Sequence, residues 1–254
     1  MERSRMRSVL TLVAVAIAAT SGNAAVLTVS GVTGHDGGNW PATLGHLTDM
    51  LNGLSPGSLG TADHSPGMDT SADPADPSTW KYAGNVWQQE WKANSRLDPN
   101  TAANRKIGWA VLDLGSVIAN LESMYLWNVR HQNDTENVAT YNVYHANVPT
   151  VALPAMPNSK SITGDYDFSS GGWTLLNNGG VLDLPINLSN NNTPQGVVDL
   201  NGISARYIGL EIITAGDVAN RVGLAQVEIT QIPEPATLAL LGLGGLVFLR
   251  RRRS

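Results

Sequence analysis

The chain has 254 residues, with 16 Lys and Arg, 21 Asp and Glu, a formal net charge of −5 and no cysteine. The lack of cysteine excludes disulfide-stapled folds and cysteine-ligated metal sites. Many of the basic residues stand in the two terminal segments, so the stretch between them is more acidic than the whole chain. Such a surface disfavours nucleic acid and anionic lipid as partners, and we predict no nucleic-acid binding.

The N-terminal residues have the three parts of a secretory signal peptide. Three arginines within the first seven residues precede an uncharged apolar run over residues 9–19, and small residues follow at 22–25. This run is shorter than the roughly 20 apolar residues that cross a bilayer core, which disfavours an uncleaved anchor. We predict an exported chain whose residues 1–24 are a signal peptide, removed by signal peptidase after Ala24.

The first part of the exported chain reads mostly as loops. Residues 26–104 are rich in Gly, Asp, Pro, Ser and Asn and have no clean hydrophobic period. One amphipathic stretch, residues 44–51, predicts a helical turn beside the first strands.

From residue 107 onward, short apolar runs rich in Val, Ile, Tyr and Trp alternate with turn residues. We predict strands over 107–114, 121–129, 138–145, 172–176, 197–200, 206–213 and 222–230. No long helical period competes with these runs, so the sequence predicts an all-β antiparallel sandwich, one domain over residues 25–230. At the end of the first run, Asp113 is expected to accept backbone hydrogen bonds in a turn that uses Gly115.

The C-terminal segment combines a proline motif, an apolar stretch and an arginine cluster. The motif is Pro233, Glu234 and Pro235, and the apolar stretch over residues 236–249 contains three glycines. The cluster that follows consists of Arg250, Arg251, Arg252 and Arg253. About 14 residues at 1.5 Å each make a helix of about 21 Å, shorter than a hydrocarbon core of about 30 Å. We therefore predict a single hydrophobic helix that is a weak membrane stop, with its arginines in the cytoplasm.

These three parts, in this order, closely resemble the PEP-CTERM sorting signal. The resemblance implies that residues 231–254 are a sorting and anchoring tail, cleaved near the Pro-Glu-Pro by an exosortase-type transpeptidase. It also implies an inner-membrane-anchored precursor and a mature form at the cell surface or in the extracellular matrix. The two prolines exclude helix through the motif and leave an extended peptide for a protease. The alternative is an ordinary C-terminal membrane anchor.

The order of motifs in the middle of the chain resembles the discoidin or galactose-binding-like family. The segments that carry this resemblance are 47–49, 109–115, 125–128, 141–144, 173–176, 205–208 and 223–228. The resemblance implies an eight-stranded jelly-roll β-sandwich whose loops bind ligands, often sugars, and a structural calcium ion. Carried over residue by residue, the calcium ligands are Asp49 and Gln226, where Gln226 replaces the usual carboxylate with an amide. An alternative interpretation makes Asp49 a plain turn residue.

Signals of catalysis are absent from the sequence. It contains no Gly-x-Ser-x-Gly elbow, no paired histidine spacing for a metal, and no glycine-rich loop that leads from a strand into a helix. Carboxylate pairs of the kind that hydrolyse glycosides leave no linear mark and remain open. We predict a protein that is not an enzyme.

Seven tryptophans are many for a chain with two phenylalanines. Indole faces stack on sugar rings, and Trp80, Trp87 and Trp91 fall in a polar stretch where a loop could present them to a ligand. Core packing is the alternative, and it is our prediction for Trp109, Trp127 and Trp173.

The sequence therefore predicts a non-catalytic surface or matrix protein with a carbohydrate-binding β-sandwich, associated with exopolysaccharide. Two other hypotheses remain: a structural envelope or biofilm component without a specific ligand, and a secreted glycan-active hydrolase or lyase. The fold does not decide among them, because sandwiches support both binding and catalysis.

Overall fold

A computed structural model describes ten parts of the chain, residues 24–34, 47–51, 68–69, 72–82, 91–94, 108–129, 137–154, 166–182, 193–215 and 221–232. Residues 23–233 form one compact unit. The other unit comprises residues 1–22 and 234–254. The predicted signal peptide up to Asn23 and the predicted sorting tail from Pro233 therefore lie outside the described residues. Within the described ranges, no helix is both long and apolar enough to span a membrane.

Eight strands form one sheet, in which every named pairing is antiparallel. They are β1 (Ala25–Val26), β2 (Gly31–Gly34), β5 (Trp91–Asn94), β6 (Gly108–Asn128), β7 (Val138–Ala146), β8 (Thr174–Val181), β9 (Gly196–Ala215) and β10 (Arg221–Gln231). The strand order is β1-β10-β6-β9-β7-β8, with β2 added beside β6 and β5 beside β10. A separate two-stranded ladder pairs β3 (Met68–Asp69) with β4 (Lys81–Tyr82).

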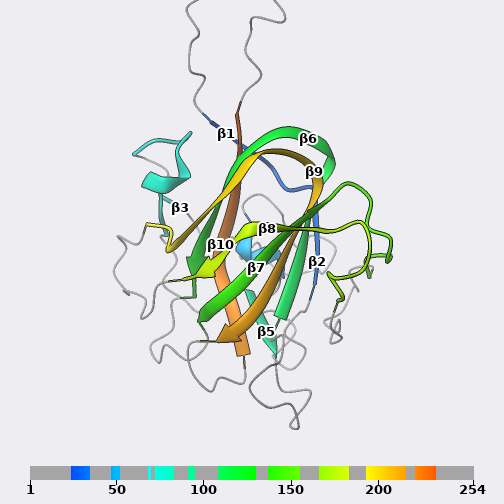
Figure 1. The fold of residues 1–254 in the computed structure, drawn as a ribbon. Coiled ribbons are helices and arrows are strands. Elements are labelled where there is room, and N and C mark those ends of the chain that lie inside the picture. The colour runs from blue at the N-terminus through cyan, green and yellow to red at the C-terminus, as the bar shows by residue number, and fades with distance from the viewer. Residues whose placement is uncertain are drawn as a thin grey trace, which may run out of the picture. The chain divides into compact units, whose positions relative to one another are not determined.

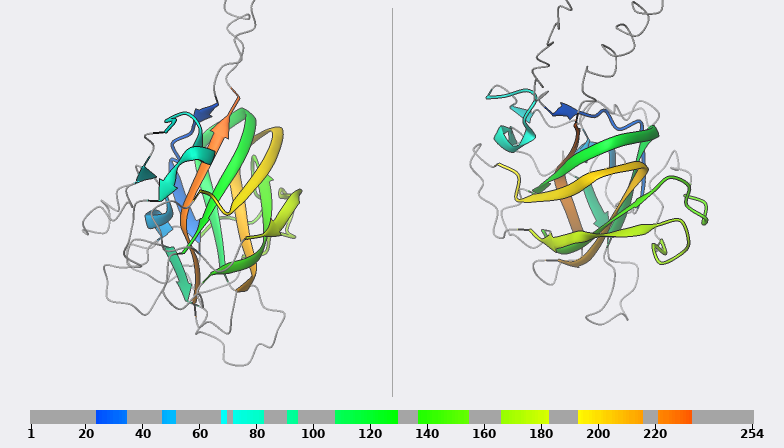
Figure 2. Two further views of the ribbon diagram at one scale, coloured as in Figure 1. Left: turned by 90° about the vertical axis from the view of Figure 1, so that its left-hand side faces the viewer. Right: turned by 45° about the horizontal axis from the view of Figure 1, so that its top comes forward.

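Strands β6 and β9 are long, and each passes through both layers of the sandwich. They pair with each other over nearly their whole lengths and arch side by side (Figures 1 and 2). The first half of β6 pairs with β2 and the second half with β10. The later half of β9 pairs with β7, which in turn pairs with β8. Folding this sheet over itself makes the two layers, so the predicted all-β sandwich is confirmed.

The sequence predicted two separate strands where β6 lies and two more where β9 lies, and this division was wrong. Each pair is one strand that bends. The bends contain residues with positive φ, which are Gly115 (82°) and Asn120 (57°) in β6 and Asn201 (54°) and Gly202 (68°) in β9. Glycine and asparagine adopt this conformation most readily, so residues that read as turns mark bends within continuous strands.

The main hydrophobic core lies between the layers. Its buried side chains come from both halves of β6, from β7, β9 and β10, and include Leu112, Leu126, Ile208 and Ile229. A short 3₁₀ helix, η1 (Leu47–Met50), adds buried side chains to the same core. The predicted helical turn at 44–51 is thus present in its second half, while residues 44–46 lie outside the described ranges.

The first and last strands meet at one end of the sandwich. Ala25 pairs with Gln231 and Val26 pairs with Thr230. The Leu27 amide donates to the Ile229 carbonyl (2.9 Å), and the Ile232 amide donates to the Asn120 carbonyl (2.9 Å). The bonded backbone at this end therefore includes Ile232, two residues beyond the predicted domain end at 230.

Candidate functional site

Trp80 is not the exposed side chain that the sugar-stacking hypothesis requires. Its indole is only 4% exposed and packs with Tyr125, Trp127 and Ala225 on the outer face of the layer that contains β10. The indole nitrogen donates to the backbone carbonyl of Asp73 (2.8 Å). A buried tryptophan whose N–H is bonded serves packing, and the prediction that Trp80 is exposed was wrong.

The structure does not test the sugar-stacking hypothesis for the other two tryptophans, Trp87 and Trp91. Trp91 begins β5, but its side chain is not among those described, and Trp87 lies outside the described residues. The tryptophans predicted to be structural are confirmed: Trp109 and Trp127 are 2% and 1% exposed, and Trp173 packs against an aromatic cluster.

The segment that carries Trp80 is held by short-range polar contacts. Asp76 caps the 3₁₀ helix η2 (Pro77–Thr79), because its carboxylate accepts the Ser78 amide (2.9 Å). Asp73 accepts the Ala75 amide in the same way (2.9 Å). These turns fix residues 73–80 against the outer face of the layer, with the indole inserted beneath them.

A pocket of about 280 Å³ opens beside this segment, and its lining residues are Ala24, Asp73, Ala75, Asp76, Glu122 and Tyr125. Burial raises the pKa of the Tyr125 hydroxyl, and the charges of Asp76 and Glu122 raise it further, against hydrogen bonds that lower it. The pocket is acidic, yet no three His, Asp or Glu side chains within the described ranges are placed to hold a metal ion.

The predicted calcium ligand Gln226 is fully buried in β10, on the same side of the strand as Glu228. Its amide nitrogen donates to the Glu228 carboxylate (2.7 Å), while its carbonyl oxygen Oε1 has no hydrogen-bond partner. A buried carbonyl oxygen without a donor fits a hard cation that takes oxygen ligands. The side chain of Asp49, the other predicted ligand, lies outside the described set.

Glu228, which is 4% exposed, was not among the residues predicted to form a site. Period-two alternation along β10 was the available signal, since it places residues 226 and 228 on one face. The resemblance drew attention to residue 226 alone, where a carboxylate was expected.

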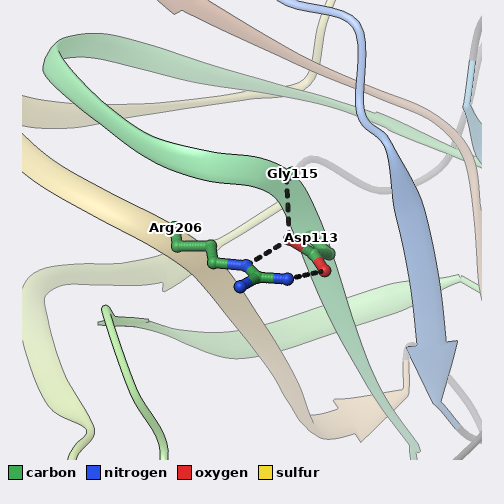
Figure 3. A network of polar contacts seen from close by, with 3 residues as sticks. All are labelled: Asp113, Gly115 and Arg206. Atoms are coloured by element: carbon green, nitrogen blue, oxygen red, sulfur yellow. Dashed lines mark hydrogen bonds and ion pairs between the residues drawn. The ribbon is translucent and has the colours of Figure 1, made fainter.

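Asp113 has the structural role that its turn predicted. Its carboxylate accepts the Gly115 amide (2.8 Å) and two bonds from Arg206, one from Nε (3.0 Å) and one from Nη2 (3.1 Å), as Figure 3 shows. Burial alone would raise the pKa of Asp113, but the bonds from Arg206 and Gly115 and the guanidinium charge lower it below its usual value. The pair joins β6 to β9 where both strands bend.

A second aromatic cluster covers the outer face of the other layer. Phe168 stacks on Tyr144 with ring centroids 4.7 Å apart, and it meets Tyr166 and Trp173 edge to face at 5.0 and 5.1 Å. Gly209 in β9 makes room for it, since a Cβ there would lie 2.3 Å from a Phe168 ring carbon. Residues 166–173 therefore cover the face of β9 that contains Tyr207 and Gly209.

A buried carboxylate lies under this cluster. Glu211 is 2% exposed and accepts bonds from the Tyr144 hydroxyl (2.8 Å) and the Asn142 amide (3.1 Å). Burial, the bond to Glu211 and the charge of Glu211 raise the pKa of Tyr144 to about 12. The raised pKa keeps the Tyr144 hydroxyl protonated, so that it can donate to the Glu211 carboxylate.

The end of the chain matches a known sorting signal. Residues 231–253 match the PEP-CTERM protein-sorting motif, beginning at the last residue of β10. The prediction of a PEP-CTERM tail is confirmed, and the chain carries the signal of an exported protein held by its C-terminal tail before processing. The motif covers only this tail.

Comparison with solved structures gives sugar-binding modules at low similarity. The family 32 CBM of Clostridium perfringens NanJ in complex with galactose has a TM-score of 0.42 and 12% identity, covering 82% of this chain and 99% of its own. The CBM32 of AlyQ in complex with 4,5-unsaturated mannuronic acid scores 0.41 at 11% identity, over 80% and 96%. The lectin-binding domain of lectinolysin (a His 62 mutant) with Lewis b scores 0.39 at 13%, over 79% and 91%. No curated protein matches the chain.

Proposed function

We propose that this chain is an exosortase-sorted protein of the cell surface or extracellular matrix, with a β-sandwich that binds carbohydrate without transforming it. The sorting motif over residues 231–253 carries the first half of the proposal. The polar stretch that contains Trp87 and Trp91 supports the second half, because indole rings in such segments stack on sugars. Exopolysaccharide is the ligand class that fits a matrix protein with an acidic exported domain.

The sorting half predicts a defined pair of chain ends. Mass spectrometry of envelope and matrix material should find a mature chain that begins at Ala25 and ends near Glu234. Replacing Pro233, Glu234 and Pro235 with alanine should leave the tail in place, since the extended motif is lost. Intact Arg250 to Ser254 on most wild-type molecules, in a host that has an exosortase, would contradict the proposal.

The binding half predicts retention on a glycan array. The fragment to use is residues 25–232, because the Ile232 amide is still bonded to Asn120. Trp87→Ala and Trp91→Ala should each weaken retention about two- to twelvefold, the loss expected for an aromatic contact of about 0.5–1.5 kcal/mol. Leu175→Ala is the matched control, since Leu175 is 49% exposed and far along the sheet order from β5.

Two results would count against carbohydrate binding. Unchanged retention in both tryptophan variants, with unchanged melting, would remove the stacking role. Release of reducing ends or unsaturated products by the purified domain, stopped by single Asp or Glu substitutions, would favour the enzyme hypothesis instead.

We also propose a structural calcium ion, held by Asp49 and Gln226 with Glu228 as a further oxygen ligand. The buried, unpartnered Oε1 of Gln226 supports this assignment. An ion that binds only the native state stabilises it by mass action, so melting in millimolar calcium should occur several degrees above melting in chelator. Asp49→Ala and Gln226→Leu should each abolish the difference, whereas Asp199→Asn, in an exposed turn of β9, should keep it. Identical wild-type melts would exclude the ion.

A further inference from the structure

The last residues of β10 are bonded on both sides. On one side, β1 pairs with Thr230 and Gln231, and the Leu27 amide reaches the Ile229 carbonyl. On the other side, the Ile232 amide donates to the Asn120 carbonyl (2.9 Å), and the Gln231 side chain donates to the Ala119 carbonyl (3.0 Å). Residues 229–232 are thus fixed within the sheet, between β1 and the bend of β6.

The sorting signal follows this segment without a spacer. Its match begins at Gln231, and Pro233 comes directly after the last bonded amide. A protease binds its substrate as an extended peptide through backbone hydrogen bonds, much as a strand adds to a sheet. Residues 229–232 already use their backbone groups within the protein, so on the N-terminal side of the Pro-Glu-Pro no free peptide is available.

We propose that β1 is a latch on the sorting signal. Tail removal proceeds from an opened state in which residues 229–232 have left the sheet, and pairing with β1 keeps the population of this opened state low. This inference rests on the proposed exosortase sorting. The latch is two residues long and the segment that it covers is the end of β10. Opening is therefore a local event: it breaks the last pairs with β1 and β6 and exposes Ile229 and Thr230, while the rest of the sheet stays paired. Val26 packs against the cluster of Trp80 and Trp127, which makes the closed state the resting one.

The latch also sets an order of processing. Before signal-peptide removal, β1 continues into the membrane-directed signal and has no free end. Cleavage after Ala24 leaves Ala25, an exposed residue, as a chain terminus, and strand ends of this kind fray. Signal-peptide removal should therefore precede and accelerate tail removal.

A reversible lock tests the latch. Val26 and Thr230 are directly opposite and, next to the bonded pair Leu27 and Ile229, form the closer, non-hydrogen-bonded type of pair. Their Cα atoms should lie about 4.5 Å apart, a distance that a disulfide bridges. The chain has no cysteine, so in V26C/T230C the introduced pair has no competitor. Neither substitution alters the matched motif, which starts at residue 231.

The assay is pulse–chase of the full precursor in a host that has an exosortase. V26C/T230C should lose its tail about tenfold more slowly than wild type, and a reductant should restore the rate, while V26C and T230C alone keep it. A tenfold slower rate corresponds to the free energy of about one backbone hydrogen bond, which the disulfide would keep formed. A six-residue Gly-Ser insertion between Ile232 and Pro233 should accelerate removal and should cancel the effect of the lock. The same insertion after the exposed Val148 is the control.

The outcomes separate the latch from the function on which it rests. Equal rates for the locked and reduced forms would overturn the latch alone, since wild-type sorting would still occur. A lock that slows removal even with the linker present would overturn it too, because the linker supplies free peptide. A wild-type chain that keeps its tail would overturn both the sorting proposal and the latch.

Discussion

Trp80→Ala is expected to destabilise the domain by about 3–5 kcal/mol, the usual cost of removing a buried tryptophan side chain. The indole is 4% exposed, contacts Tyr125 and Trp127, and bonds the Asp73 carbonyl. Its loss leaves a cavity under residues 73–80, while the Asp73 carbonyl keeps its bond from the Asp76 amide (3.1 Å). Since domains are stable by about 5–15 kcal/mol, urea denaturation should show a clear fall in the unfolding midpoint.

Trp80→Phe keeps one aromatic ring in the cluster and removes the smaller ring of the indole together with its N–H. It should lose less stability than Trp80→Ala. The folded fraction of either variant should retain carbohydrate as the wild type does. A Trp80 variant that melts as the wild type does but loses glycan retention would show that Trp80 contributes to ligand binding.

Phe168→Ala should lower the free energy of unfolding by a similar amount, about 3–5 kcal/mol. The ring is 2% exposed and contacts four other aromatic rings, of Trp109, Tyr144, Tyr166 and Trp173. Its removal uncovers the outer face of β9 and admits water to the bonded pair of Tyr144 and Glu211. The measurement is again the free energy of unfolding in urea, with the exposed Leu175→Ala as control.

A double-mutant cycle with Gly209 makes this prediction specific. Gly209→Ala should destabilise the wild type, because the new Cβ would overlap the Phe168 ring at 2.3 Å. In the Phe168→Ala background the same change should cost much less, so the two effects should not add. Additive effects would show that Phe168 does not occupy the space above Gly209.

The sequence predicted the sandwich because strand periodicity is a local property. Ile208, Leu210 and Ile212, in the predicted strand 206–213, alternate along β9 and lie in the core. The continuity of β6 was missed because Gly115 was predicted to lie in a turn, and that of β9 because the apolar pattern stops at residue 200 and resumes at 206. Pairing between these two distant strands carries the backbone through both bends. The packing of residues 166–173 over the outer face of β9 was also missed, because most of this segment has no strand periodicity.

The candidate sites, too, could be predicted only where the signal is local in the sequence. The sorting tail is a linear signal, and it was recognised from Pro233 to Arg253 without knowledge of the fold. The burial of Trp80 depends on Tyr125 and Trp127, about 45 residues further along the chain, and no local pattern reports that contact. Glu228 could have been paired with Gln226 from alternation, but the absence of a partner on Gln226 Oε1 is visible only in three dimensions.

The pairing of distant segments has a consequence for how the chain is made. Gly108 pairs with Ile212 and Leu126 with Gly196, so the central ladder joins residues about 70–100 positions apart. Closing such long loops costs conformational entropy before stabilising contacts can form, so folding should be slow. It also requires nearly the whole chain, because the paired strands lie far apart in the sequence. Ala25 finds its partner only when Gln231 has arrived. The topology thus delays closure of the sandwich until nearly the whole domain has been synthesised.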